Sequence, residues 1–397
     1  MAIKVGILLF LVCSTLIPIG RGLAETVVDV TKFGAKPNGK VDSSMEMIRA
    51  WNKACKSPGP SAKLLIPRGK FRTGEVIFQG PCTANKRVTV EIQGTLIADT
   101  DLSVYTSDYW ISFEHVDNVV VTGGGTINGR GQATWKYAAG DTIQNAPLLP
   151  VSMLFQSVRH SAVHHLNFVN SMGFHMKVTD SSGINVSHLH ITAPKNSPNT
   201  DGIHISETTH INITDSVIKT GDDCVSIGDG NTNVIVSKIK CGPGHGISIG
   251  SIGKRADEKS VKGVRVSDCT LTGTTNGARI KTYRASPKLQ VSNIIFENLI
   301  LKNVKRPIII DQDYNSKNRI QPSNVKIRDV HFRNIRGTTS SKNAVTLTCS
   351  KSNPCEGIEF ANIDIAPTPK VRGLLPVSCV NAKPIFKGKV KPARCRC

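Results

Sequence analysis

Acidic residues and one histidine recur at a fixed interval in the middle of the chain. Asp201, Asp223 and His245 are each 22 residues apart, and Asp222 directly precedes Asp223. A short strand-like run follows each of the three positions. A period of this size is typical of a solenoid of stacked β-coils, in which residues one period apart lie about 4.8 Å from one another. The spacing therefore predicts that three carboxylates and an imidazole meet on one face, where acid and base chemistry is possible.

Neighbouring carboxylates suit the hydrolysis of a glycosidic bond with inversion. One acid must keep its proton to release the leaving oxygen, while a carboxylate roughly 6.5–9.5 Å away activates water on the opposite face. Adjacent like charges raise one pKa, so Asp222 and Asp223 beside Asp201 are expected to supply both states. The alternative is that they are ordinary turn residues. Strict alternation would point Asp201 and Asp223 inward with Ile203 and Val225, so the hypothesis requires a bend at both positions.

Stacking the coils also aligns a column of polar residues. Apolar residues of four successive runs form ladders toward the interior, and the residues between them, His204, Ser226, Ser248 and Arg279, face outward. Lys281 lies beside this column. A groove floored by serine and glycine, with Arg279 and Lys281 at one end, would admit a flat sugar and bind its carboxylate. The alternative is that these two are ordinary solvent-facing basic residues.

A secretory signal peptide is predicted for residues 1–24. Lys4 is followed by an apolar run of about 15 residues and a small-residue exit at Ala24, for which a buried terminal element is the alternative. No other apolar run is long enough to cross a bilayer. We therefore expect residues 25–397 to be exported to the extracellular space and not to act in a membrane.

The chain is strongly basic, with a formal charge of +21. Residues 1–24 hold Lys4 and Arg21 and no acidic residue, so their removal leaves +19. Nucleic-acid binding is one explanation of such a charge. Export, and the spread of lysine and arginine through many turns, argue against nucleic acid and favour an anionic matrix polymer as the partner.

Paired cysteines and glycosylation acceptors also fit export. Ten cysteines follow the signal segment, an even number that suits an oxidising compartment. Asn185 and Asn212 begin Asn-X-Ser/Thr acceptors. Three local pairings are plausible: Cys55 with Cys82, Cys224 with Cys241, and Cys349 with Cys355. Spacing leaves open which further cysteine is free, Cys269 or one of the tail residues Cys379, Cys395 and Cys397.

One helix is predicted ahead of a long series of short β runs. Ser43 and Glu46 fit a capping box, and apolar residues follow at helical spacing within residues 42–55. Beyond this segment, runs with apolar residues at alternate positions recur every 23 to 33 residues from position 184 onward. These runs begin at Val119, Ile184, Ile211, Val234, Val264, Ile294, Val325 and Ile358.

The recurring runs predict an all-β, parallel β-helix. Alternating apolar pairs separated by bends indicate coils of two or three short strands rather than helical repeats. A β-sandwich is the alternative, but a sandwich does not require a repeat that also realigns charged residues. No linker precedes the Pro- and Lys-rich tail from Pro367, so residues 25–397 are expected to form one domain, with the helix covering its open apolar end.

Metal and phosphate sites are less well supported. The Gly-rich segment 123–129 lacks the Lys-Ser/Thr of a phosphate loop, and the basic balance offers no dense cage for calcium. Several histidines have spacings only loosely like those of zinc motifs, and no predicted helix carries them. They include His160, His164, His165, His188 and His190. We expect neither a metal nor a cofactor.

At four segments the sequence resembles the plant polygalacturonases of glycoside hydrolase family 28. The resemblance extends over nearly all of residues 25–397 and rests on 197–204, 221–224, 241–248 and 279–281. It implies a right-handed parallel β-helix that hydrolyses α-1,4 links between galacturonates of pectin, with inversion and without a metal.

The resemblance also implies a role for each residue of the cluster. Asp222 resembles the general acid, and Asp201 and Asp223 resemble the pair that holds the nucleophilic water. His245 resembles the residue that supports the acid's protonation. Arg279 and Lys281 resemble ligands of the substrate carboxylate.

Two further residues are assigned to substrate binding. Asn199 belongs to the first signature segment, and Tyr314 matches a sugar-contacting tyrosine, for which a core aromatic residue is the alternative. Segments 99–105 and 174–176 resemble the exo-acting, pollen-associated branch, so we expect release of galacturonate by a monomer. Endo action, pectin binding without turnover, and pectate lyase activity are the alternatives.

Overall fold

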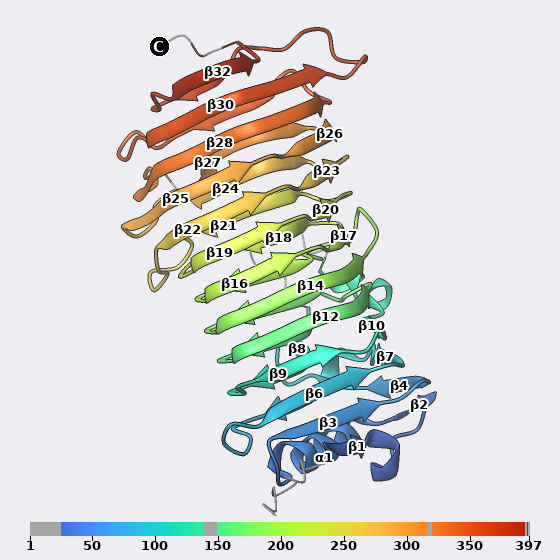
Figure 1. Ribbon diagram of the computed structural model, residues 1–397. Helices are drawn as coiled ribbons and strands as arrows, with labels where there is room; N and C mark the ends of the chain where they lie inside the picture. Colours follow the sequence, from blue (N-terminus) through green and yellow to red (C-terminus); the bar gives the residue numbers. More distant parts are fainter. Residues whose placement is uncertain (1–24, 139–148, 316–319, 394, 396–397) are drawn as a thin grey trace, which may run out of the picture.

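The computed structural model describes residues 25–138, 149–315, 320–393 and 395. Their strands stack as the coils of a right-handed parallel β-helix, with the N-terminal helix at one end and the C-terminal strands at the other (Figure 1). The pairings between successive coils are parallel. The predicted fold class is therefore confirmed. The predicted signal peptide, residues 1–24, lies outside the described residues.

Most coils contribute a strand to each of three columns. Column A runs the length of the molecule. Its strands are β1 (Thr26–Asp29), β3 (Ser61–Ile66), β6 (Arg87–Ile92), β9 (Val119–Thr122), β12 (Arg159–Val169), β14 (Ser182–Thr192), β16 (Thr209–Thr214), β19 (Thr232–Ser237), β22 (Val261–Ser267), β25 (Leu289–Glu297), β28 (Val325–Thr339), β30 (Glu356–Pro367) and β32 (Ile385–Lys391).

Column B joins column A through the long strands β12, β14, β28 and β30, which contribute to both. Its other strands are β2 (Asn38–Asp42), β4 (Lys70–Thr73), β7 (Thr95–Ala98), β10 (Thr126–Asn128), β17 (Val217–Lys219), β20 (Lys240–Cys241), β23 (Thr270–Thr272) and β26 (Ile300–Val304). Two columns thus share one continuous sheet.

Column C forms a separate sheet, and it carries the acidic residues singled out in the sequence. Its strands are β5 (Val76–Gln79), β8 (Tyr109–Glu114), β11 (Val151–Gln156), β13 (Met176–Thr179), β15 (Ile203–Ser206), β18 (Asp223–Ile227), β21 (Gly246–Ile252), β24 (Asn276–Tyr283), β27 (Arg306–Tyr314), β29 (Val345–Thr348) and β31 (Ser378–Val380). The tail after Pro367 supplies β31 and β32, so it continues the sheets.

The recurring apolar runs lie in column A, and the predicted alignment is wrong for one of them. Runs from Ile184 to Ile294 pair in succession as expected. Ile294 then pairs with Val330, and Val325 pairs with Leu289, so the predicted frame is wrong at Val325. Strand β28 contains two alternating apolar runs, and the one that aligns with the preceding coil also continues a phenylalanine stack.

That stack fills the interior near the C-terminal end. Phe296, Phe332 and Phe360 are fully buried, and Phe386 packs against them. Successive ring centroids lie 5.5, 5.1 and 5.6 Å apart, and the rings are nearly parallel. Parallel pairing places identical side chains one coil apart, so the rings stack along the helix axis.

Helix α1 (Ser44–Lys56) covers the N-terminal end of the β-helix, as predicted (Figure 1). Met47, Trp51 and Cys55 are buried. The Trp51 ring lies 5.1 Å from that of Phe78 and 5.9 Å from that of Phe113. These contacts shield the apolar interior from water. The described residues also form four short 3₁₀ helices: η1 (Val30–Phe33), η2 (Leu102–Val104), η3 (Gly131–Ala133) and η4 (Trp135–Tyr137).

The predicted capping box is wrong, although the helix begins where expected. Ser43 precedes the first helical residue, but its hydroxyl makes no capping bond and instead accepts the amide of Lys36 at 3.2 Å. Glu46 pairs with Arg49 at 2.6 Å. Packing of the helix against the coils therefore outweighs this local signal.

The disulfides match the three predicted pairings. Cys55–Cys82, Cys224–Cys241 and Cys349–Cys355 are all bonded, and a fourth bond joins Cys379 to Cys395. Cys269 is the free cysteine of the described residues and is fully buried. Burial raises the pKa of its thiol to about 12.

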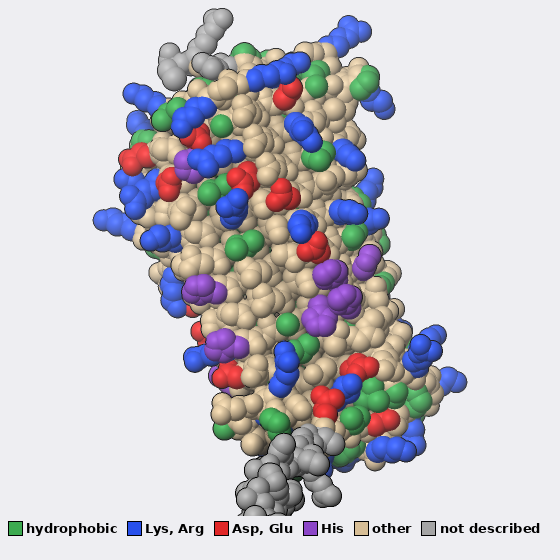
Figure 2. Space-filling view, viewed as in Figure 1, with side chains coloured by type: hydrophobic (Ala, Val, Ile, Leu, Met, Phe, Trp, Pro, Cys, Tyr) green, Lys and Arg blue, Asp and Glu red, His purple; other side chains and the backbone are tan. Residues whose placement is uncertain are grey.

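The surface in Figure 2 carries lysine and arginine side chains scattered over the whole face rather than gathered in one patch. This distribution agrees with the spread of basic residues in the sequence. In the described part of the chain, no helix has the length and apolar character needed to span a membrane.

The phenylalanine stack leads to a first prediction. Phe332→Ala should lower the free energy of unfolding by about 3–5 kcal/mol, because it removes a buried ring from the middle of the stack. Urea unfolding followed by tryptophan fluorescence would measure the loss. Ile235→Ala, at a residue that is 43% exposed, is the control and should change stability by less than about 0.5 kcal/mol. Similar losses in both variants would contradict the assigned packing.

Candidate active site

The polar column predicted from the sequence lies on column C. His204 pairs with Ser226, Ser226 with Ser248, and Ser248 with Arg279. One coil earlier, Lys177 pairs with His204. The apolar neighbours of these residues are buried in the interior, as the alternation required.

An irregularity in β18 turns Asp223 onto the polar face. Asp223 pairs with Gly246 and Val225 with Ile247, so β18 has one residue more than its partner between these pairs. Such a bulge reverses the direction of the side chain that precedes it. The bend required at Asp223 is therefore present. The equal 22-residue spacing is misleading by one position, because His245 lies opposite Asp222 and not Asp223.

Asp201 reaches the same face from just before β15. Its backbone oxygen accepts the amide of His175 at 2.9 Å, and its Oδ2 accepts the Ser226 hydroxyl at 2.6 Å. The next residue must be glycine. A Cβ at Gly202 would lie 2.5 Å from the backbone oxygen of Cys224, which is too close for any side chain. This close approach brings the two coils together at the carboxylates.

Asp223 is held by two cations and a hydroxyl. Arg279 donates to Oδ1 at 2.7 Å, Lys281 donates to Oδ2 at 2.9 Å, and Ser248 donates to Oδ1 at 2.8 Å. Asp223 is 1% exposed, and the two cations are 8% and 7% exposed. Burial alone would raise the pKa of Asp223, but the charges of Arg279 and Lys281 outweigh it and hold the pKa well below its usual range. Asp223 is therefore ionised.

Asp201 is shifted in the opposite direction. Burial, followed by the negative charges of Asp222 and Asp223, raises its pKa well above the usual value. The hydrogen bond from Ser226 only partly offsets this. The two buried carboxyls thus have pKa values shifted in opposite directions, and in the free protein the proton is favoured on Asp201.

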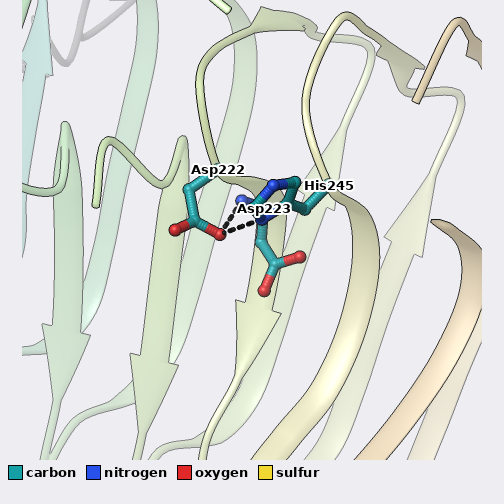
Figure 3. Close-up of side chains that lie close together, drawn as sticks. All are labelled: Asp222, Asp223 and His245. Carbon is teal, nitrogen blue, oxygen red and sulfur yellow. Dashed lines mark hydrogen bonds and ion pairs between the residues drawn. The ribbon is translucent and has the colours of Figure 1, made fainter. Parts of the chain in front are cut away.

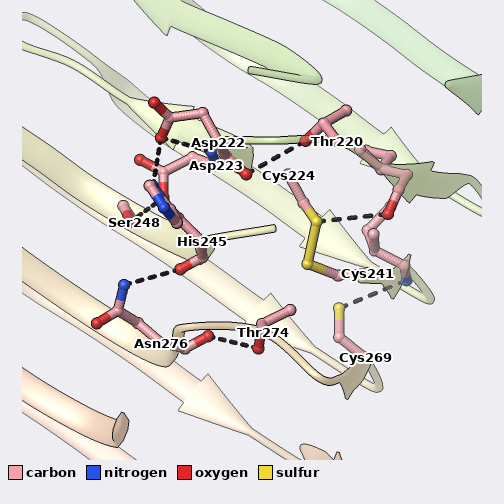
Figure 4. The surroundings of a disulfide bond; sticks show 12 residues. Thr220, Asp222, Asp223, Cys224, Cys241, His245, Ser248, Cys269, Thr274 and Asn276 are labelled. Atoms are coloured by element: carbon pink, nitrogen blue, oxygen red, sulfur yellow. Dashed lines mark hydrogen bonds and ion pairs between the residues drawn. A yellow bond between two sulfur atoms is a disulfide. The ribbon is translucent and has the colours of Figure 1, made fainter. Parts of the chain in front are cut away.

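Asp222 lies beside the imidazole of His245 and is partly exposed (Figure 3). Its Oδ1 is 2.8 Å from His245 Nδ1 and accepts the amide of Asp223 at 2.8 Å. Figure 4 shows how backbone contacts fix this pair: Asn276 donates to the oxygen of His245, and Thr220 donates to that of Asp222. The Cys224–Cys241 disulfide joins the same two coils.

Sequence reasoning placed His204, Ser226 and Ser248 on this face without giving them a role. A chain of hydrogen bonds runs from His204 Nδ1 to Ser226 Oγ at 2.8 Å and on to Asp201. Burial, followed by the positive charge of Lys177, lowers the pKa of His204 to about 3, so its imidazole is neutral. The aligned column was the signal that pointed to these residues.

Asn199 and Tyr314 lie on opposite sides of the acids along the column. Asn199 lines a cavity together with Phe174 and Lys177. Tyr314 is partly exposed at the end of β27, and the ammonium of Lys281 lies 5.1 Å from the centre of its ring. Its contact with Lys281 places it at the site rather than in the core.

Asp222, Asp223 and His245 form the one group in the described residues with three potential metal-ligand atoms within 4.8 Å of one another. Both oxygens of Asp223 are already bound by cations, which opposes a further positive charge. The histidines considered for zinc lie elsewhere on β12 and β14, where His165 stacks on His188 at 4.6 Å.

Comparisons with known proteins identify the family. The model of glycosyl hydrolases family 28 matches residues 55–383. The chain is 43% identical to an exopolygalacturonase of Arabidopsis thaliana, over 94% of this chain and 90% of that protein. It is 40% identical to an exopolygalacturonase of Platanus acerifolia, over 94% of this chain and 99% of that protein. The chain belongs to glycosyl hydrolase family 28.

Solved structures support the same fold. An exopolygalacturonase of Thermotoga maritima superimposes with a TM-score of 0.75 at 19% identity, over 91% of this chain and 92% of that one. An endo-xylogalacturonan hydrolase of Aspergillus tubingensis gives a TM-score of 0.77 at 24% identity, over 91% and 100%. At these identities the comparison concerns the fold alone.

The raised pKa of Asp201 predicts a pH-dependent effect on stability. A carboxyl with a raised pKa in the folded state contributes most below its unfolded value of about 3.9, and this contribution is lost as the pH rises. Asp201→Asn keeps an acceptor for Ser226 and removes the buried charge. The variant should therefore melt at a higher temperature than wild type at pH 7, with a smaller difference at pH 4.

Differential scanning calorimetry at the two pH values would test this effect. Asp117→Asn, at an exposed position, is the control and should change the melting temperature little at either pH. A less stable Asp201→Asn protein at pH 7 would contradict the destabilisation assigned to burial of the Asp201 charge and to its repulsion by Asp222 and Asp223.

Proposed function

We propose that this protein is a secreted polygalacturonase that hydrolyses α-1,4 links of pectate with inversion. One observation carries the proposal: Asp201, Asp222 and Asp223 lie together on column C, where burial raises the pKa of Asp201 while Arg279 and Lys281 hold that of Asp223 low. Membership of glycosyl hydrolase family 28, and relatives named as exopolygalacturonases and polygalacturonases, support the substrate class.

In this proposal Asp222 is the general acid. Its Oδ1 is occupied by the Asp223 amide and His245, which leaves Oδ2 to carry a proton toward the leaving oxygen. The partial exposure of Asp222 gives a substrate access to it. His245 keeps the carboxyl oriented through its contact with Oδ1, and we assign to it the support of the general acid.

Asp201 and Asp223 hold the nucleophilic water. A carboxylate whose pKa is raised is a stronger base once ionised, so Asp201 is the better acceptor of the water proton. The single proton that the free protein favours on Asp201 lies on Asp222 in the proposed reactive state, and Asp201 is then ionised. This proton leaves Asp222 for the departing sugar oxygen, the hydroxide of the water bonds to the anomeric carbon, and Asp201 takes the water's second proton. Asp201 then releases its proton to solvent and Asp222 takes one up, so the cluster again carries one proton, on Asp222.

Arg279 and Lys281 attract the substrate carboxylate. Together they carry two positive charges against the single negative charge of Asp223, so an excess of one positive charge is left for a ligand. The Tyr314 ring beside Lys281 offers an apolar surface for a sugar. We place Asn199 among the substrate-binding residues on the other side of the acids.

We also propose that the protein is exported and acts as a monomer. The four disulfides suit an oxidising compartment and the predicted signal peptide, so we propose an extracellular, cell-wall location. Asn185 and Asn212, the proposed glycosylation sites, are exposed on adjacent coils, and the Asn212 amide donates to Asn185 at 3.0 Å. We propose exo action because several relatives are named as exopolygalacturonases.

The general-acid role predicts the effect of Asp222→Asn. The variant should lose turnover of polygalacturonate by at least about 100-fold, since it cannot protonate the leaving oxygen, yet still bind the polymer. Chromatography of early products from the wild-type and variant proteins would measure this. Galacturonate as the sole early product of the wild type would support exo action, and a spread of oligomers would indicate endo action.

Two outcomes of this experiment would overturn the proposal. Retained turnover in Asp222→Asn would show that Asp222 is not the general acid. Pectate binding by a wild-type protein that forms no new reducing ends would favour a wall protein that binds pectin without cleaving it.

A second prediction concerns metal and pH. Turnover should be unchanged by a chelator and give no unsaturated product absorbing in the ultraviolet, because hydrolysis here uses only protein carboxyls. Turnover should fall as the pH rises through the raised pKa of Asp201, because the carboxyl cluster then loses the one proton that the general acid needs. Calcium-dependent formation of an absorbing product would identify a lyase, and undiminished turnover well above neutral pH would contradict the acid role.

A further inference from the structure

The outward residues of column C carry a cation on each side of the acids. Lys177 lies two coils before Ser226, whose strand also contains Asp223, and Arg279 lies two coils after it. Two steps between parallel strands amount to about 10 Å. A polymer laid along this column would therefore meet a positive charge on either side of the bond to be cleaved.

The two cations differ in how they are partnered. Arg279 is bound to Asp223, as is its neighbour Lys281. Among residues 25–138, 149–315, 320–393 and 395, none forms an ion pair or side-chain hydrogen bond with the ammonium of Lys177. A lysine without an acidic partner can give its full charge to a ligand.

Lys177 also lines a cavity of about 30 Å³, which is too small for a whole sugar but whose lining suits one edge of a sugar acid. Apolar side chains form most of the wall, including Phe174, Leu149 and Met172, and Asn199 adds an amide. Asp108, an exposed residue, contributes a carboxylate to the lining. The neutral His204 lies next to Lys177, with the Phe174 ring 5.0 Å from its own. Among the described residues that line the cavity, Lys177 is the one cation.

We propose that a galacturonate on the N-terminal side of the acids lies across the mouth of this cavity, and that Lys177 requires the carboxyl of this sugar to be free and ionised. The inference rests on the proposed polygalacturonase function and adds a subsite to it. A methyl ester at this sugar removes the charge that Lys177 binds and adds bulk beside Phe174. Lys177 is thereby a residue that determines the enzyme's preference for unesterified pectate.

The experiment compares three substrates: trigalacturonate and the two trimers methyl-esterified at one terminal sugar only. We expect wild type to prefer trigalacturonate over one of the esters by roughly 10- to 100-fold in kcat/KM, the usual range for a hydrogen bond to a charged group. Lys177→Met should abolish this preference for that ester only. Lys177→Arg, which keeps the charge, should retain most of it.

Lys240→Met is the matched control. Lys240 is exposed on β20 in the other sheet, so the substitution removes the same charge away from the cavity. It should leave the preference unchanged. Equal losses on all three substrates in Lys177→Met would show a structural role, for example through Asp108, and would overturn the proposal. An unchanged preference in Lys177→Met would overturn it as well.

Equilibrium binding separates failure of this inference from failure of the proposed function. Calorimetric titration of trigalacturonate needs no turnover, and it can be repeated in the Asp222→Asn background. Weaker binding by Lys177→Met, together with inactive wild-type protein, would keep the subsite and reject the hydrolase. Equal binding with and without Lys177 in an active enzyme would reject the subsite and keep the hydrolase.

Discussion

Hydrogen bonding between parallel strands is the constraint on which the rest of this structure depends. It fixes the step from coil to coil, and in the coils of the site it brings residues 22 to 31 positions apart into contact. Phenylalanines therefore stack in the interior, while hydroxyls and charges align outside. The site is built from the same ladder: a bulge turns Asp223 onto the outer face, and the absence of a side chain at Gly202 lets the coil that carries Asp201 approach Cys224 closely.

Alternation and spacing were enough to predict much of this architecture. The β-helix, its helical cap, three disulfides and the outward column of His204, Ser226, Ser248 and Arg279 followed from the sequence. These features depend on patterns that repeat over many coils, so a misassigned residue in one coil does not change the predicted fold. Grouping of the carboxylates followed from the same register.

Features that depend on single residues were not predictable in the same way. The bulge shifts His245 to face Asp222, a difference of one position that no spacing reveals. Val325 and Val330 begin equally good alternating runs, and only packing against the previous coil selects Val330. The sequence indicated that Arg279 and Lys281 bind an anion, but not that Asp223 of the protein itself already occupies them.

Cys269 illustrates what burial does to reactivity. Its sulfur lies in the interior, where it donates to the backbone oxygen of Ser267 and accepts the amide of Ile239, near the Cys224–Cys241 bond (Figure 4). Disulfide exchange requires a thiolate, and a pKa of about 12 leaves almost none at physiological pH. In the folded protein the Cys269 thiol therefore does not attack the adjacent disulfide. The Cys224–Cys241 bond is preserved as long as the interior remains closed to solvent.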